Sequence, residues 1–272
     1  MDHVNGFTSK AHALRYLREQ GHKFTSLLTS PEANPKVAKN GKEGVLTAPL
    51  HLAPFDLSGF QVCPQASAGC AAACLHTAGN PAYMKGKDAS RKDKTVAYFK
   101  HRDAFLALLV FEIEALERKA ERLGMEAGIR LNATSDLPFE VRTVSVAGGD
   151  IKLMELFPNV SFYDYTKVTK RALAFAGGRM PENYHITFSK TENNDTDCAK
   201  VLAAGGNVAV VCDPEVYKVA TVTGRLPFPY NNAKAIDGDA HDFRPVDGVG
   251  VVVALKAKGD AKADTSGFVL RA

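Results

Sequence analysis

The chain has 272 residues, of which 45% are hydrophobic and 24% are charged, an ordinary globular composition that is long enough for one or two domains. Its net charge of +4 is compatible with an anionic ligand or nucleic acid but establishes neither. Residues 1–10 are polar, and no apolar run approaches the roughly 18 residues that span a bilayer. We therefore expect neither a secretory signal nor a membrane span, and we predict a cytosolic protein.

The first half of the chain predicts helices and one strand. Hydrophobic periodicity predicts an amphipathic helix over residues 9–20, followed by an irregular segment over residues 30–44. Residues 45–54 alternate and predict a strand, although Pro49 weakens it. Basic residues and glycines predict a loop over residues 79–93, and a long apolar stripe predicts one helix over residues 95–123.

In the second half, short apolar segments alternate with helical or loop segments. This alternation predicts an α/β fold with a parallel sheet of buried strands. We find no internal repeat and no low-complexity tract. Together with residues 45–54, the predicted strands number six, the later five being 128–134, 160–166, 184–189, 206–212 and 249–256.

Polar side chains follow each predicted strand. In barrels and open α/β sheets, ligands bind at the carboxyl ends of the strands, although loops begin with polar residues in any case. The polar residues at these ends include Asn132, Ser135, Asp136, Lys167, Ser189, Glu192, Asp213 and Lys256. We interpret this pattern as a ligand-binding rim.

Three of the five cysteines fall within twelve residues, as Cys63, Cys70 and Cys74 with the spacing C-x6-C-x3-C. An odd number of cysteines in a cytosolic chain indicates metal binding or catalysis rather than disulfides. Three thiolates suit a [4Fe–4S] cluster with one open iron, or zinc with His76 or water as fourth ligand. The alternative is a group of small buried residues, since free cysteine packs as a small hydrophobe.

A second constellation lies at residues 236–248, where four aspartates, His241 and Arg244 are concentrated. It could bind a cation or ligand or provide acid–base catalysis, or it could be a hydrogen-bonded turn with a buried Asp–Arg pair. Residues 147–150 (AGGD) predict a surface turn. The basic run at residues 85–94 could contact phosphates, but such runs more often form a solvated face.

A series of motifs along the chain resembles a family of phage- and prophage-encoded proteins called gene product eighty-eight-like. The resemblance covers nearly the whole chain and implies a phage origin and action in the host cytoplasm, without an established activity. The motifs are NPK at 34–36, LHLAP at 50–54, CP at 63–64, CL at 74–75, RLNATSDLPFE at 130–140, FYDYTK at 162–167, NYHITFSKTEN at 183–193, DGDAHDFRPVD at 237–247 and LKAKG at 255–259.

The architecture is also similar to that of radical S-adenosylmethionine enzymes, which have six βα units and three cluster cysteines after the first strand. This resemblance implies a single-domain partial (β/α)6 TIM-like barrel over residues 45–272, with a helical and irregular N-terminal extension over residues 1–44. The usual spacing of that superfamily is C-x3-C-x2-C, and its glycine-glycine-glutamate motif is replaced here by NATSD at residues 132–136.

Our leading hypothesis is a phage-encoded iron–sulfur enzyme similar to that superfamily, acting on nucleic acid or a nucleotide. Cys63, Cys70 and Cys74 would bind the [4Fe–4S] cluster, whose open iron would bind S-adenosylmethionine. Asp239, His241 and Arg244 would close the cavity as catalytic residues. Five residues at strand ends would bind the cofactor: Asn132, Ser135, Asp136, Lys167 and Ser189.

Two alternatives stay open. One is a zinc-containing barrel that modifies nucleic-acid bases, in which the cysteines are structural. The other is a non-catalytic protein that carries the cluster and binds DNA or a host factor, for which strongly salt-dependent DNA affinity would be diagnostic.

Overall fold

The computed structural model describes residues 3–33, 38–74, 85–227, 229–230 and 232–272. The chain forms two compact units, and each is described by itself. Unit 1 comprises Met1–Cys63 and Ala82–Phe162, and unit 2 comprises Pro64–Pro81 and Tyr163–Ala272. The N-terminal 44 residues belong to unit 1 together with the strand that follows them, and the boundary at residue 45 stays a prediction.

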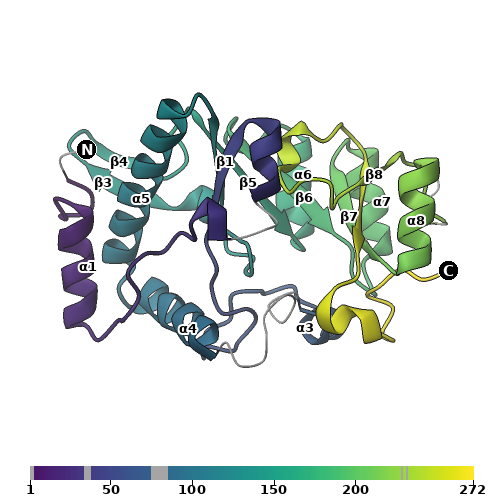
Figure 1. The fold of residues 1–272 in the computed structure, drawn as a ribbon, viewed down its shortest axis with the longest axis horizontal. Coiled ribbons are helices and arrows are strands. Elements are labelled where there is room, and N and C mark those ends of the chain that lie inside the picture. Colours follow the sequence, from purple (N-terminus) through teal and green to yellow (C-terminus); the bar gives the residue numbers. More distant parts are fainter. Residues whose placement is uncertain (1–2, 34–37, 75–84, 228, 231) are drawn as a thin grey trace. The chain divides into compact units, whose positions relative to one another are not determined.

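Unit 1 is built around a long buried helix and two parallel strands (Figure 1). Strand β1 pairs in parallel with β2, and β2 pairs in parallel with the first residues of β5. In chain order the unit contains α1 (Lys10–Glu19), η1 (Pro31–Ala33), η2 (Lys39–Glu43), β1 (Val45–Pro49), α4 (Lys85–Lys100), α5 (Arg102–Arg122), β2 (Glu126–Arg130), η4 (Phe139–Val141), β3 (Thr143–Val146), β4 (Gly149–Lys152) and the start of β5 (Val160–Thr166).

The helix predicted over residues 9–20 is confirmed as α1, whose N-terminus is capped by the Ser9 hydroxyl accepting from the His12 amide. The single helix predicted over residues 95–123 is wrong. It is two helices, α4 and α5, separated at His101, whose backbone leaves the helical region with φ −133° and ψ 51°.

The loop predicted over residues 79–93 is also wrong from Lys85 onward, where α4 begins. Lysine, arginine and alanine have good helix propensity, which outweighs the single glycine within α4. Residues 75–84, which include His76, lie outside the described part of the chain, as does the NPK motif at residues 34–36.

A buried carboxylate fixes the chain before β1 to helix α5. Oε2 of Glu112 accepts hydrogen bonds from the amides of Leu27 (2.9 Å) and Leu28 (2.8 Å). The ammonium group of Lys94 on α4 donates to the Leu27 carbonyl at 2.9 Å, and burial lowers the pKa of Lys94. These bonds satisfy backbone groups that would otherwise be buried without partners.

Unit 2 is an α/β layer of parallel strands, which confirms the predicted α/β fold with a parallel sheet (Figure 1). Its strands after β5 are hydrogen-bonded in the order β6-β7-β9-β8. In chain order the unit contains α3 (Ala68–Ala72), the end of β5, α6 (Thr169–Ala176), β6 (Tyr184–Ser189), α7 (Asp195–Ala203), β7 (Asn207–Cys212), α8 (Pro214–Thr223), β8 (Ala235–Asp237), η5 (Arg244–Val246), β9 (Val252–Lys256) and η6 (Gly259–Ala263).

Several strand predictions need correction. The strands predicted over residues 45–54 and 128–134 are shorter, since β1 ends at Pro49 and β2 ends at Arg130. β8 was not predicted, because three residues are too short for a recognisable alternation. The turn predicted at residues 147–150 is confirmed only for residues 147–148, and the antiparallel strands β3 and β4 on either side were missed.

No helix in the described residues is both long enough and apolar enough to cross a membrane.

Replacing Glu112 with alanine should destabilise the protein by about 3 kcal/mol, because two buried amides lose their acceptor and Lys94 loses a neighbouring negative charge. The free energy of unfolding in urea measures this loss. Replacement of the exposed Glu121 on the same helix with alanine is the control and should change stability by less than about 0.5 kcal/mol. Equal unfolding midpoints for the two variants would contradict the role given to Glu112.

Candidate functional site

Two of the three clustered cysteines lie on or next to the short helix α3 of unit 2. The hydroxyl of Ser67 caps the helix by accepting from the Cys70 amide at 3.1 Å. Cys70 is within α3 and Cys74 follows it, and both thiols are partly buried. The helix consists of small residues, since α3 has the sequence AGCAA.

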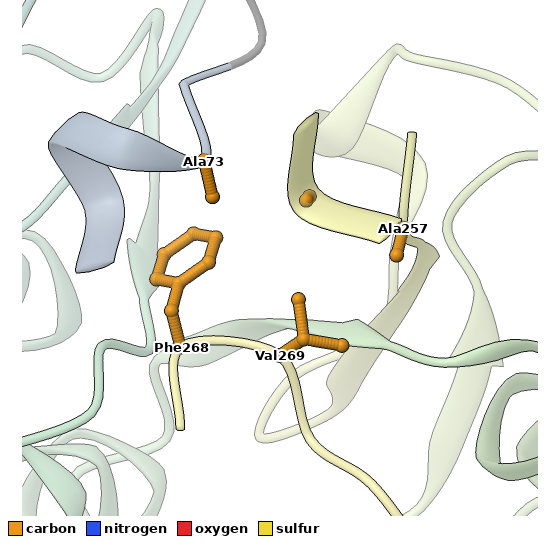
Figure 2. Close-up of a cluster of buried hydrophobic side chains, with 5 residues drawn as sticks. Ala73, Ala257, Phe268 and Val269 are labelled. Carbon is orange, nitrogen blue, oxygen red and sulfur yellow. The ribbon is translucent and has the colours of Figure 1, made fainter. Parts of the chain in front are cut away.

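Helix α3 packs against the C-terminal segment of the chain. Figure 2 shows Ala73 pointing toward the ring of Phe268, with Val269 and Ala257 beside it. Cys70 packs against this apolar cluster, which also contains Ala261. Ala257 directly follows β9, so the cysteine-bearing helix lies at the carboxyl end of a parallel strand.

A glutamate at the end of another strand fixes the helix by hydrogen bonds. Oε2 of Glu192 accepts from the Ser67 hydroxyl at 2.6 Å, and Oε1 accepts from the Gly69 amide at 2.8 Å. Burial acts to raise the pKa of Glu192, but these hydrogen bonds outweigh it and lower the pKa overall. Glu192 follows β6, so the carboxyl ends of β6 and β9 both hold α3.

The C-terminal segment that contacts α3 is itself bonded to β7. The Leu270 amide donates to the Val211 carbonyl at 2.8 Å, and the Asp213 amide donates to the Leu270 carbonyl at 3.0 Å. Within the segment, the carboxylate of Asp264 accepts from the Val269 amide at 3.0 Å. Lys190, directly after β6, donates to the Gly267 carbonyl. The support for α3 therefore spans the ends of three strands.

Cys63 lies in unit 1, at the carboxyl ends of β1 and β2. Its sulfur accepts from the Phe55 amide at 3.5 Å and donates to the Thr134 carbonyl at 3.9 Å. The Thr134 hydroxyl in turn donates to the Leu52 carbonyl at 2.6 Å. The thiol is partly buried, as are those of Cys70 and Cys74.

Three of the predicted cofactor residues form the turn that follows β2. The Asn132 side-chain oxygen accepts from the Ser135 hydroxyl and the Leu137 amide, both at 2.8 Å, and its amide group donates to the Leu137 carbonyl at 2.9 Å. The Asp136 amide donates to the Val62 carbonyl at 2.8 Å. Asn132 and Ser135 thus hold the turn that carries Thr134, the acceptor of the Cys63 thiol.

The remaining predicted residues are distributed over unit 2. Lys167 and Ser189 lie at the carboxyl ends of β5 and β6. Asp239 follows β8 and bonds the loop after β9, since its carboxylate accepts from the Lys256 amide at 3.0 Å and pairs with Lys258 at 2.6 Å. Lys167 and Ser189 are at strand ends, as the sequence indicated, whereas Asp239 lies at the end of a strand that was not predicted.

His241 and Arg244 belong to a buried network in the connection from β8 to β9. The guanidinium of Arg244 lies 3.1 Å from the Asp247 carboxylate, and these side chains are 0% and 1% exposed. Nη2 of Arg244 lies 3.2 Å from Nδ1 of His241. The hydroxyl of Tyr163 on β5 donates to Asp242 at 3.2 Å, which joins the network to the sheet. Arg244 therefore holds the connection together from within the protein interior.

Two groups near this network have displaced pKa values. Burial raises the pKa of Asp247 to about 6, with Asp242 adding to the rise and Arg244 opposing it. Burial lowers the pKa of His185 on β6 to about 4, and the positive charge of Arg244 adds to the effect. Nε2 of His185 has no hydrogen-bond partner among the described residues.

The other two cysteines have a different environment. Cys198 and Cys212 are fully buried, and burial raises the pKa of their thiols to about 11 and about 12. Both are therefore poor thiolate ligands, as expected for core residues. None of the five cysteines is in a disulfide.

The residues that the structure describes do not by themselves assemble a metal centre. Within the described residues, no three His, Cys, Asp or Glu side chains form a group that could hold a metal ion. Cys63 belongs to unit 1 while Cys70 and Cys74 belong to unit 2, so the set of three is not contained in either unit. As a donor set, three accessible thiols nonetheless suit iron or zinc.

The role of Glu192 could not be predicted from the sequence, in which it is one of several polar residues at strand ends. Ser67 and Gly69 lie between the cysteines, but nothing in the sequence connects them to a residue more than 120 positions away. Ser67, directly before a run of small residues, was the one available signal, because serine is a typical N-cap.

Replacing Gly69 with alanine should destabilise the protein by about 1–3 kcal/mol, because a Cβ atom there would lie 2.2 Å from the Ser266 hydroxyl and 2.8 Å from Glu192. Gly86 is the matched control, since it is also helical and its Cβ would meet nothing within 4 Å. Gly86→Ala should be neutral or stabilising by up to about 1 kcal/mol. Urea unfolding compares the two, and equal effects would contradict the close approach at Gly69.

The pKa values of His185 and Asp247 predict opposing effects of pH on stability. His185 has a pKa of 6.5 in the unfolded chain and about 4 in the folded protein. Its contribution to the free energy of unfolding is therefore fully present above pH 6.5 and is lost as the pH falls toward 4. Asp247 has a pKa of 3.8 in the unfolded chain and about 6 in the folded protein. Its contribution to the free energy of unfolding is therefore fully present below pH 3.8 and is lost as the pH rises toward 6. Each contribution is about 3 kcal/mol.

Urea unfolding between pH 4 and pH 7 tests this opposition. Asp247→Asn should make stability rise more steeply with pH than in the wild type, and His185→Gln should make it rise less steeply or fall. Stability curves that stay parallel to that of the wild type in both variants would show that neither group titrates as described.

Comparison with known proteins identifies the family. Searches of curated proteins and of solved structures find no match. The family model described as gene product 88 matches residues 26–272, which is most of the chain and includes every candidate residue discussed above. The chain therefore belongs to the gene product 88 family of phage proteins.

Proposed function

We propose that this protein is an iron–sulfur protein in which Cys63, Cys70 and Cys74 bind a [4Fe–4S] cluster and leave one iron open. The observation that carries the proposal is the contrast among the five thiols. The three clustered thiols are partly exposed at carboxyl ends of parallel strands, whereas Cys198 and Cys212 are buried with raised pKa values. Only the first three have the accessibility that a cluster ligand requires.

The surroundings of the thiols support this proposal. The Phe55 amide donates to the Cys63 sulfur, and hydrogen bonds to sulfur tune the potential of iron–sulfur clusters. Cys70 and Cys74 are held by a helix that Glu192 and the C-terminal segment fix in place. Ligands supported by an outer layer of hydrogen bonds keep their orientation when a metal binds.

We further propose an enzyme similar to radical S-adenosylmethionine proteins, with the strands arranged as a partial (β/α)6 barrel. A cluster with an open iron supplies one-electron chemistry to a cofactor bound there. Lys167 and Ser189, at strand ends, would contact the cofactor, while Asn132, Ser135 and Asp136 would shape its site through the turn after β2. Asp239 and His241 would face the substrate, and the buried Arg244 would orient His241.

The substrate class is proposed from the phage family, which makes nucleic acid or a nucleotide in the host cytoplasm the expected target. The net charge of +4 is compatible with such a substrate.

Anaerobic purification and reconstitution with iron and sulfide test the cluster. We expect about four irons per chain, a brown colour, and an electron paramagnetic resonance signal that changes when S-adenosylmethionine is added. Alanine at Cys63, Cys70 or Cys74 should abolish iron binding. Cys198→Ala is the matched control and should retain it, because that thiol lies in the core.

Other results would favour other functions. A colourless protein that contains zinc and unfolds when Cys70 is replaced would indicate structural zinc in a base-modifying enzyme, because structural zinc contributes folding energy. A cluster without turnover, together with strongly salt-dependent DNA affinity, would indicate a binding protein.

A further inference from the structure

We infer that Glu192 is a positioning residue for the proposed metal centre, holding the helix that carries Cys70 and Cys74 at the carboxyl end of β6. This inference rests on the proposed function, because it assigns Glu192 to the same three-cysteine site. All the contacts that support it lie within unit 2.

The carboxylate of Glu192 makes two hydrogen bonds to the first turn of α3. One comes from the hydroxyl of Ser67 at 2.6 Å and the other from the backbone amide of Gly69 at 2.8 Å. A hydrogen bond to a charged group contributes more stability than a neutral one. Because α3 has only five residues, it has too few internal bonds to be stable alone.

The same serine connects Glu192 to the cysteine. Ser67 donates its hydroxyl hydrogen to Glu192 and accepts from the Cys70 amide at 3.1 Å. A relay of two hydrogen bonds therefore runs from the end of β6 to the backbone of Cys70. Loss of the carboxylate would free the Ser67 hydroxyl to rotate, which would weaken the cap as well as the anchor.

Close packing allows little adjustment at this point. A side chain at Gly69 would collide with both Ser266 and Glu192, so the helix approaches the two residues as closely as a glycine permits. On the other side, Ala73 packs against Phe268 (Figure 2). The helix is thus held by hydrogen bonds at its start and by apolar packing at its end.

The test begins with hydrogen exchange in the metal-free full-length protein. Residues 67–73 should exchange about tenfold faster in Glu192→Ala than in the wild type, because a charge-assisted anchor is lost. Glu192→Gln should restore most of the protection, since its amide oxygen can accept from Gly69 and its nitrogen can donate to Ser67. Replacement of the exposed Glu182 with alanine is the matched control and should exchange as the wild type does.

Reconstitution with iron and sulfide is the second measurement. Glu192→Ala should bind less than half of the iron that the wild type binds, whereas Glu192→Gln and Glu182→Ala should bind the full amount. Wild-type exchange and wild-type iron content in Glu192→Ala would overturn the inference. If Glu192→Ala unfolds, Ser67→Ala is the second variant. It removes one of the two bonds to Glu192 together with the cap on the Cys70 amide, so residues 67–73 should exchange faster, and wild-type protection there would overturn the inference.

Failure of the inference can be told apart from failure of the proposed function. If the wild type binds no metal under any condition, the iron–sulfur function is refuted, while the exchange data still show whether Glu192 holds α3. If the wild type binds iron and Glu192→Ala binds it equally, the function stands and the positioning role is refuted.

Discussion

Parallel pairing of strands is the constraint on which the arrangement of the candidate residues depends. A parallel strand must be followed by a connection that returns the chain to the opposite end of the sheet, so the loops after neighbouring strands emerge on one edge. In unit 2 the loops after β6, β7 and β9 emerge together and support α3. In unit 1 the segments after β1 and β2 emerge together and hold Cys63.

The connection from β8 to β9 stabilises unit 2 in a different way. This connection buries a charged side chain, Arg244, together with the carboxylates of Asp242 and Asp247. A buried ion pair recovers its desolvation cost only with good geometry and further hydrogen bonds, and Tyr163 supplies one such bond. Burial of Asp247 itself raises its pKa, and burial of the nearby His185 lowers its pKa, to which the charge of Arg244 adds.

Several features could be predicted from particular residues. The helix α1 followed from the spacing of its apolar residues, and the buried strands β5, β6 and β7 followed from short, mainly apolar segments that alternate with helical or loop segments. The break at His101 was missed because apolar segments stand on both sides of it and no proline or glycine marks it. β8 and the hairpin β3–β4 were missed because strands of three or four residues carry too little pattern.

By itself, the sequence determined the α/β class, the family, and the unusual grouping of Cys63, Cys70 and Cys74, because these depend on composition and on local spacing. The tertiary structure decided which polar residue serves which purpose. It showed that Asn132 and Ser135 hold a turn, that Arg244 is buried with Asp247, and that Glu192 anchors the cysteine helix. The physical reason is that a hydrogen bond acts over about 3 Å, and only folding brings a carboxylate and an amide from distant parts of the chain within that distance.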